Sequence, residues 1–83
     1  MAEEKNIRLK CIYGNKVRLK NLRTGKLEEY TLVTFSEEKP GSGYISNYTE
    51  LGRAIWAKHE GDEVSFTSAG KPQSYLIEKI ENA

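Results

Sequence analysis

The sequence predicts an α+β fold in which one short helix covers a small antiparallel β-sheet of four to five strands. Apolar and polar residues alternate over several separate runs, which is typical of strands with one buried face. Over 49–58 the apolar spacing changes to the period of a helix. Turn residues separate these segments, and the predicted order is strand, strand, strand, loop, helix, strand, strand.

The first half of the chain is predicted to be a β-meander. Alternation predicts strands over 7–11 and 16–20, and a run rich in β-forming residues predicts a third strand over 27–35. The turn before the third strand contains Gly25, which can take a positive φ. Residues 36–43 are rich in charged residues, Gly and Pro, and we expect them to form an exposed loop.

The helix is expected over 49–58. Leu51 and Ile55 fall on one helical face, and Thr49 can cap the first turn through its hydroxyl group. Gly61 follows the helical pattern and is expected to terminate it.

The chain is predicted to end in two further strands. A turn at 69–72 separates an alternating run over 63–67 from a last strand over 75–80. Ile77 and Ile80 are three residues apart instead of two, which indicates a β-bulge or a frayed strand end.

Length and composition indicate one globular unit. The 83 residues are too few for two domains, so we expect a flexible N-terminus over 1–6 and a single domain over 7–83. Cys11 is the only cysteine, which excludes an internal disulfide and a Cys-based metal cluster and favours a reducing, cytoplasmic environment. The sequence offers no apolar run for a signal peptide or a membrane span.

Charge is unevenly distributed although the net charge is only +1. Residues 1–26 contain eight basic and two acidic residues, and residues 27–83 contain five basic and ten acidic residues. A basic row is a candidate contact for nucleic acid or for an acidic protein surface. Its members are Arg8, Lys10, Lys16, Arg18 and Lys20. The alternative interpretation is a solvated sheet face, which the lack of interleaved aromatic residues favours.

Four segments, in order along the chain, carry a resemblance to a known family. They are Tyr13–Leu22, Tyr30–Val33, Gly43–Ser46 with Leu51–Ile55 after it, and Gly61–Val64 with Tyr75–Ile77 after it. From residue 11 to 81 the chain resembles the C-terminal domain of the Gre family of bacterial transcription elongation factors. The resemblance implies an FKBP-like fold.

The resemblance also implies a function. In full-length Gre factors an N-terminal coiled coil enters the secondary channel of RNA polymerase, and acidic residues at its tip help to hold a metal ion for RNA cleavage. No such helical hairpin precedes Ile7, so we expect no transcript cleavage, no catalytic residues, no cofactor and no metal. The part that is present resembles the docking domain, which grips the rim of the channel, so the expected partner is RNA polymerase.

Partner contacts are expected around the start of the helix. Many relatives have Asn or Asp followed by Ser-Pro there, whereas this chain has Tyr48-Thr49-Glu50. The predicted partner-binding residues are Tyr44, Ser46, Asn47, Tyr48, Thr49, Glu50 and Arg53. Two other functions stay open: a prolyl isomerase, which needs an apolar pocket between sheet and helix, and a nucleic-acid binder that uses the basic N-terminal hairpin.

Three further residue patterns have structural interpretations. Trp56 is expected to pack in the core or at its rim, and His59 to interact with the dipole at the end of the helix. Glu28 and Glu29 are neighbours on a strand, so they are expected to point to opposite faces and not to share a proton or a metal ion.

Overall fold

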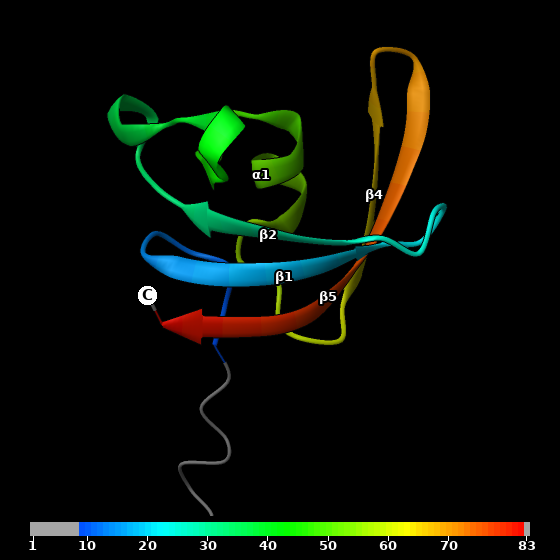
Figure 1. The fold of residues 1–83 in the computed structure, drawn as a ribbon, viewed down its shortest axis with the longest axis horizontal. Coiled ribbons are helices and arrows are strands. Elements are labelled where there is room, and N and C mark those ends of the chain that lie inside the picture. Colours follow the sequence, from blue (N-terminus) through cyan, green and yellow to red (C-terminus); the bar gives the residue numbers. More distant parts are fainter. Residues whose placement is uncertain (1–8, 83) are drawn as a thin grey trace, which may run out of the picture.

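A computed structural model describes residues 9–82 of the chain (Figure 1). The predicted flexible N-terminus at 1–6 therefore lies outside the described residues. The strands are β1 (Asn15–Asn21), β2 (Leu27–Leu32), β3 (Tyr44–Ile45), β4 (Glu63–Ser68) and β5 (Lys71–Asn82), and the helix is α1 (Glu50–Ile55). Two short 3-10 turns, η2 (Phe35–Glu37) and η3 (Pro40–Ser42), lie between β2 and β3.

The five strands form one sheet in the order β3-β2-β1-β5-β4. The pairs β1/β2, β1/β5 and β4/β5 are antiparallel, which confirms the predicted fold class. The β2/β3 pair is parallel, because the segment with η2 and η3 leads the chain back alongside the end of β2 before β3 begins. β3 then runs in the same direction as β2. Only the two-residue β3 departs from the antiparallel pattern.

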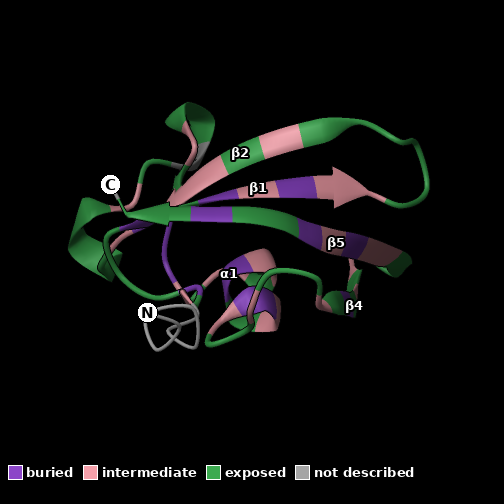
Figure 2. Cartoon of the chain, turned by 90° about the horizontal axis from the view of Figure 1, so that it is seen from below, coloured by how far each residue is buried: buried purple, intermediate pink, exposed green. Residues whose placement is uncertain are grey.

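The core lies between one face of the curled sheet and α1, and Figure 2 shows the helix on one side of β1 and β5. Val17 and Leu19 from β1, Ile77 from β5 and Ile55 from α1 are completely buried. The opposite face of the sheet, turned away from α1, is called the outer face below. The alternation seen in the sequence thus separates a covered face from a solvated one.

The predicted bulge in the last strand is confirmed. Arg18 pairs with Lys79 and Leu19 pairs with Ile77, so Glu78 is the extra residue of β5. Because the bulge absorbs one residue, Ile77 and Ile80 both face the core although they are three positions apart.

Three predicted boundaries are wrong. Over its described part, 9–11, the first predicted strand is absent from the sheet, and Lys10 forms only an isolated bridge with His59. The third strand ends at Leu32 instead of residue 35. The last strand begins at Lys71 instead of residue 75, because Ala69 and Gly70 both have positive φ and close a two-residue turn.

The helix ends at Ile55, three residues before the predicted end, and Gly61 does not terminate it. Ala57 has a φ of 64°, which is incompatible with a continuing helix. The backbone of 57–58 instead bonds to Cys11: the amide of Ala57 donates to the Cys11 carbonyl group, and the amide of Cys11 donates to the Lys58 carbonyl group, both at 2.9 Å. Within residues 9–82 no helix is long and apolar enough to cross a membrane.

Candidate partner-docking surface

The loop that joins β3 to α1 is held by Ser46, which is completely buried. Its Oγ donates to Glu38 Oε1 at 2.8 Å and accepts from the amide of Tyr48 at 3.1 Å. Its carbonyl oxygen accepts from Thr49 Oγ1 at 2.8 Å. One small side chain and its carbonyl group thus fix the backbone around Tyr48.

The first turn of α1 is capped as predicted. Thr49 Oγ1 accepts from the amide of Gly52 at 2.9 Å, and Glu50 lies in the first turn, where the helix dipole favours a negative charge. A Cβ atom on Gly52 would overlap with the carbonyl oxygen of Ser46. The helix can therefore lie directly on the loop only because residue 52 is glycine.

Tyr48 projects from this fixed loop and is 68% exposed. Its ring lies against that of Phe35, with centroids 5.1 Å apart, and Phe35 is itself 64% exposed. Large apolar side chains as exposed as these are typical of interaction surfaces when they occur together. The pair joins η2 to the loop between β3 and α1.

A second aromatic pair is linked to the same loop. The hydroxyl group of Tyr13 donates to Asn47 Oδ1 at 3.4 Å, and the Tyr13 ring meets the Trp56 ring edge to face, with centroids 4.8 Å apart. Asn47 precedes Tyr48 in the loop, so both pairs are connected to the same loop. We call Phe35, Tyr48, Tyr13 and Trp56, linked through Asn47, the aromatic row.

Residues 10–82 match the model of the family described as "Transcription elongation factor, GreA/GreB, C-term". The chain belongs to this family. The resemblance of the sequence to the Gre C-terminal domain is thereby confirmed, and the chain contains a transcription elongation factor domain.

Individual relatives agree with the family. Transcription elongation factor GreA of Helicobacter hepaticus is 43% identical over 71 residues, which cover 86% of this chain and 44% of that protein. GreA of Nautilia profundicola is 37% identical over 68 residues, which cover 82% of this chain and 42% of that protein. The chain thus spans less than half the length of the curated relatives that it matches.

Solved structures show the same fold. GreA factor homolog 1 of Thermus thermophilus is similar with a TM-score of 0.76 at 18% identity, over 93% of this chain and 51% of that one. The elongation factor GreA/GreB from Nitrosomonas europaea gives a TM-score of 0.74 at 19% identity, over 94% of this chain and 65% of that one. At these identities the likeness concerns the fold, and it supports the Gre-like α+β architecture.

The predicted partner-binding residues of this Gre-family domain fall into two groups. Ser46 and Thr49 point inward, and their hydrogen bonds shape the loop and the helix cap. The other five residues are exposed or half-buried and lie where a partner can reach them; they are Tyr44, Asn47, Tyr48, Glu50 and Arg53. The structure therefore places the predicted set around one loop but gives its members different roles.

The sequence analysis did not place Phe35 and Tyr13 of the aromatic row beside the loop. For Phe35 a usable pattern was present: Thr34 and Glu37 form a capping box, with Thr34 Oγ1 donating to Glu37 Oε1 at 2.9 Å. A Thr followed three residues later by Glu is typical of the start of a helical turn. The pattern would have placed Phe35 in an exposed turn instead of a strand.

The sequence-based interpretation of Trp56 is confirmed, whereas that of His59 is wrong. Trp56 is half-buried and packs against the core, which confirms the packing interpretation. The interpretation of His59 as a partner of the helix dipole is wrong, because α1 ends four residues earlier. The amide of His59 instead donates to the carboxylate of Asp62 at 2.9 Å.

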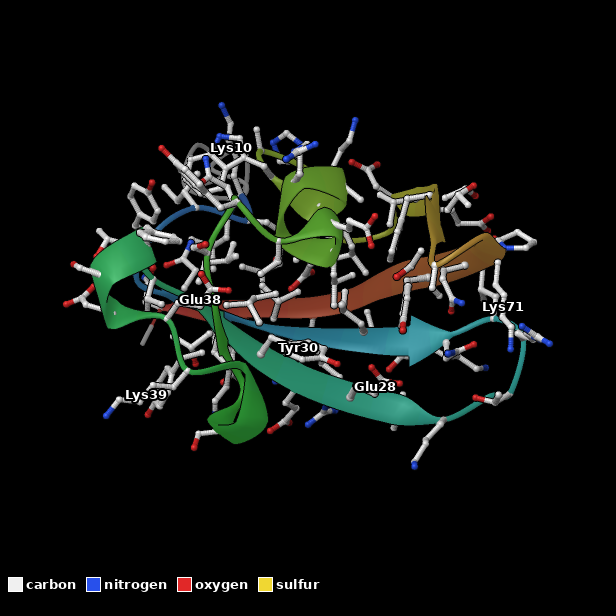
Figure 3. The ribbon with its side chains drawn as sticks, turned by 90° about the horizontal axis from the view of Figure 1, so that it is seen from above. Lys10, Glu28, Tyr30, Glu38, Lys39 and Lys71 are labelled. Atoms are coloured by element: carbon white, nitrogen blue, oxygen red, sulfur yellow. The ribbon has the colours of Figure 1, made fainter. Side chains whose placement is uncertain are left out.

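The basic row does not form one surface. Lys16, Arg18 and Lys20 lie on the outer face, where Glu29 is 3.2 Å from Arg18 and 4.0 Å from Lys16. Lys10 lies instead beside His59 on the side of α1, as Figure 3 shows, and Arg8 is outside the described residues. Because acidic residues alternate with the basic ones on the outer face, the arrangement favours a solvated sheet face.

Glu28 and Glu29 point to opposite faces, as predicted. Glu28 accepts a hydrogen bond of 2.6 Å from the hydroxyl group of Tyr30 on the covered face, and the two residues are labelled on β2 in Figure 3. Burial, followed by this hydrogen bond and the charge of Glu28, raises the pKa of Tyr30. Burial also raises the pKa of Tyr75, with Glu28 as the second cause.

An open hollow of about 340 Å³ lies between α1 and the β4/β5 hairpin. Its apolar part is Leu51 with the stacked rings of Phe66 and Tyr75, whose centroids are 6.0 Å apart. The remainder is polar and is formed by Glu50, Ser68 and Gln73. Within residues 9–82 there is no group of three or more His, Cys, Asp or Glu side chains that could hold a metal ion.

Proposed function

We propose that this chain is a non-catalytic transcription elongation factor module of the cytoplasm. It binds RNA polymerase at the rim of the secondary channel, modulates elongation and competes with full-length Gre factors for that position. Membership of the GreA/GreB family supports the class of process. The proposal concerns this domain alone.

The observation that carries the proposal is the exposed Tyr48 on a loop whose backbone is fixed. Binding costs little conformational entropy when the backbone of the loop is already ordered. Tyrosine is also among the residues that most often dominate binding at interfaces. Tyr48 therefore has the position and the chemistry of a docking anchor.

The proposal is tested by retention of the chain on immobilised core RNA polymerase at modest salt, and by competition with a full-length cleavage factor. We expect Tyr48→Ala to weaken binding by at least about tenfold, since truncation of an interface anchor typically costs about 2 kcal/mol or more. Leu27→Ala is the matched control, because Leu27 is 52% exposed on the outer face and should be neutral. No retention and no competition by the unchanged chain would refute the proposal.

The two alternative functions have less support. The hollow beside α1 is open and half polar, whereas a prolyl isomerase needs an enclosed apolar pocket. A nucleic-acid site on the outer face would have to overcome Glu29 and Glu81, which lie among its lysines. A prolyl isomerase rate above background, or RNA binding that falls steeply with salt, would favour these alternatives instead.

A further inference from the structure

The strand β4 forms an open edge of the sheet. It stands last in the strand order, and among the described strands it pairs with β5 alone. Natural edge strands are commonly short, or carry lysine, proline or a bulge, and these features discourage the addition of another strand. The opposite edge, β3, has only two residues, whereas β4 has six in an unbroken register, with Glu63 at its start as its one charged residue. The edge at β4 therefore lacks these protective features.

The backbone groups of every second residue of β4 point away from β5. In an antiparallel pair, residues that bond to the partner strand alternate with residues whose amide and carbonyl groups point the other way. Thr67 lies opposite Pro72, which has no amide hydrogen to donate. Ser65 lies opposite Ser74, whose carbonyl group accepts from the amide of Leu22, on the side of β1, at 2.9 Å. Ser65 and Thr67 therefore direct their own backbone groups outward.

The same alternation adds Glu63, so three residues at a spacing of two present an amide and a carbonyl group at the edge. Among residues 9–82, the backbone hydrogen bonds outside the paired strands involve no residue of β4. An extended peptide carries donors and acceptors at this same spacing, and peptides bind sheet edges in this way in several recognition domains. The edge thus has the hydrogen-bonding pattern that another strand would satisfy.

The helix α1 forms the other wall of a groove along this edge, and Figures 1 and 2 both show α1 beside β4. Residues from both elements line an open hollow of about 250 Å³: Glu50, Arg53, Ala54, Ser65, Phe66 and Thr67. The hollow of about 340 Å³ described above shares Phe66 and Glu50 with it, so the two hollows adjoin. We call this space the β4 groove.

The middle of the β4 groove is apolar. The half-buried Phe66 lies on the same face of β4 as the buried Val64, so its ring is on the covered side of the sheet. Leu51 and Ala54 are also half-buried and line the groove from α1. An added strand would place every second side chain on this side, where an apolar side chain can cover Phe66.

The charges around the groove do not favour either sign. Glu50 and Arg53 lie on the same wall and have opposite charges. Glu63 begins β4, and Lys71 pairs with Ser68 at its other end. Because the acidic and basic residues balance, we expect the backbone pattern and the apolar contact to select the ligand.

We propose that the β4 groove binds an extended peptide segment of a partner protein, which joins the sheet as a sixth strand and places an apolar side chain against Phe66. The inference goes beyond the proposed function and does not depend on RNA polymerase. A second copy of this chain fits less well, because α1 stands where the sheet of that copy would continue.

The inference is tested by nuclear magnetic resonance on the full chain with capped heptapeptides as probes. Threonine alternates in them with one apolar residue type, which is valine, leucine or phenylalanine. At about 1 mM of a peptide that binds, the amides of Ser65 and Thr67 are expected to exchange with water at least about threefold more slowly. The amides of Val64 and Phe66, which already face β5, should change less.

Two controls separate strand addition from other binding. The same peptide with methyl groups on its three central amide nitrogens should not slow the exchange, because it cannot donate to the edge. Ser65→Pro is expected to bind the unmethylated peptide at least about fivefold more weakly, since an outward donor is lost. Ser65→Ala keeps the amide and should stay within about twofold of the unchanged chain.

Thermal unfolding establishes that the variants are folded, as expected because proline is tolerated in edge strands. Thr67→Pro replaces Ser65→Pro if that variant is not folded.

Three outcomes would overturn the inference. The first is that none of the peptides binds. The second is that Ser65→Pro and Ser65→Ala bind equally well, or that exchange slows without the alternation along β4, because the peptide then lies elsewhere. The third is a dimer in sedimentation without peptide that Ser65→Pro dissociates, because the edge then takes a second copy of the chain. These measurements contain no RNA polymerase, so either proposal can fail without the other.

Discussion

Gly52 is the residue on which the packing of α1 against the loop between β3 and α1 depends most directly. In the interior of an ordinary helix, replacing Gly by Ala stabilises the protein by about 1 kcal/mol, since Ala loses less backbone entropy. Here the added methyl group would overlap with the Ser46 carbonyl oxygen and lie close to Thr49 Oγ1. At this position, replacing Gly by Ala should therefore destabilise the protein.

We expect Gly52→Ala to lower the free energy of unfolding by about 2 kcal/mol, because the loop and the helix cap must move to make room. Urea unfolding followed by circular dichroism measures the change. Gly41→Ala is the control, since a Cβ there meets nothing within 4 Å and its φ lies outside the left-handed region. Equal stabilities for the two variants would contradict the close packing.

Cys11 is completely buried, and burial, followed by the charge of Asp62, raises the pKa of its thiol from 9.0 to about 12. Below pH 9 both the folded and the unfolded chain keep the proton, so the thiol contributes a constant stability. Between pH 9 and 12 the unfolded chain loses the proton first, so the free energy of unfolding falls as the pH rises.

Cys11→Ala should remove this part of the alkaline loss of stability. The measurement is the free energy of unfolding of both proteins between pH 7 and 11, compared as a difference so that Tyr and Lys titrations cancel. The variant itself is expected to be less stable at neutral pH because of the small cavity. A difference between the two proteins that does not change with pH would show that the thiolate is not disfavoured in the fold.

At the scale of elements, the bulge in β5 sets which residues reach the core. Removal of Glu78 leaves Ile77 and Ile80 on the same face, because the alternation becomes regular with Lys79 between them. Removal of Leu76 instead reverses the facing of one half of the strand relative to the other.

A deletion of Glu78 is therefore expected to fold, with a loss of stability smaller than that of a deletion of Leu76. The Leu76 deletion should cost several kcal/mol, since a buried Ile or Tyr would be turned to solvent and leave a cavity. Urea unfolding of both deletions is the measurement. A Glu78 deletion that is as unstable as the Leu76 deletion would mean that the bulge itself is needed.

The elements with one covered face were predictable from the sequence. β1 and β4 show period-two alternation because one side of each meets the core, β2 is rich in β-forming residues, and Thr49 marks the start of α1. The end of α1 was not predictable, because Ala57 leaves the helix to bond to Cys11, a contact between segments far apart in the chain. Helical spacing alone contains no information on such a partner.

At the scale of the molecule, the aromatic row combines residues from four segments, which contain Tyr13, Phe35, Tyr48 and Trp56. The position of Tyr48 next to the helix start could be predicted from the sequence, whereas Phe35 and Tyr13 reach the loop only through tertiary packing. The basic row was predicted as one surface because its residues are close in sequence. Lys10 and Lys16 nevertheless lie on different sides of the fold.

The outer face is therefore expected to be dispensable for binding. Lys16→Glu/Lys20→Glu should change the affinity for RNA polymerase by no more than about twofold, because exposed charges away from an interface are screened by salt. The same affinity measurement serves, with Tyr48→Ala as the variant that must lose binding. A large loss of affinity in the double lysine variant would indicate that the outer face takes part in binding.

The shortness of α1 has a consequence for how the surface behaves in time. Six residues form too few turns to persist as a helix in water, so α1 exists only while the sheet holds it. Amide hydrogens such as that of Arg53, bonded to Thr49 at 2.9 Å, should therefore exchange with solvent through opening of the whole domain rather than by local fraying. Tyr48, the proposed anchor, would then lose its fixed position only when the whole domain opens.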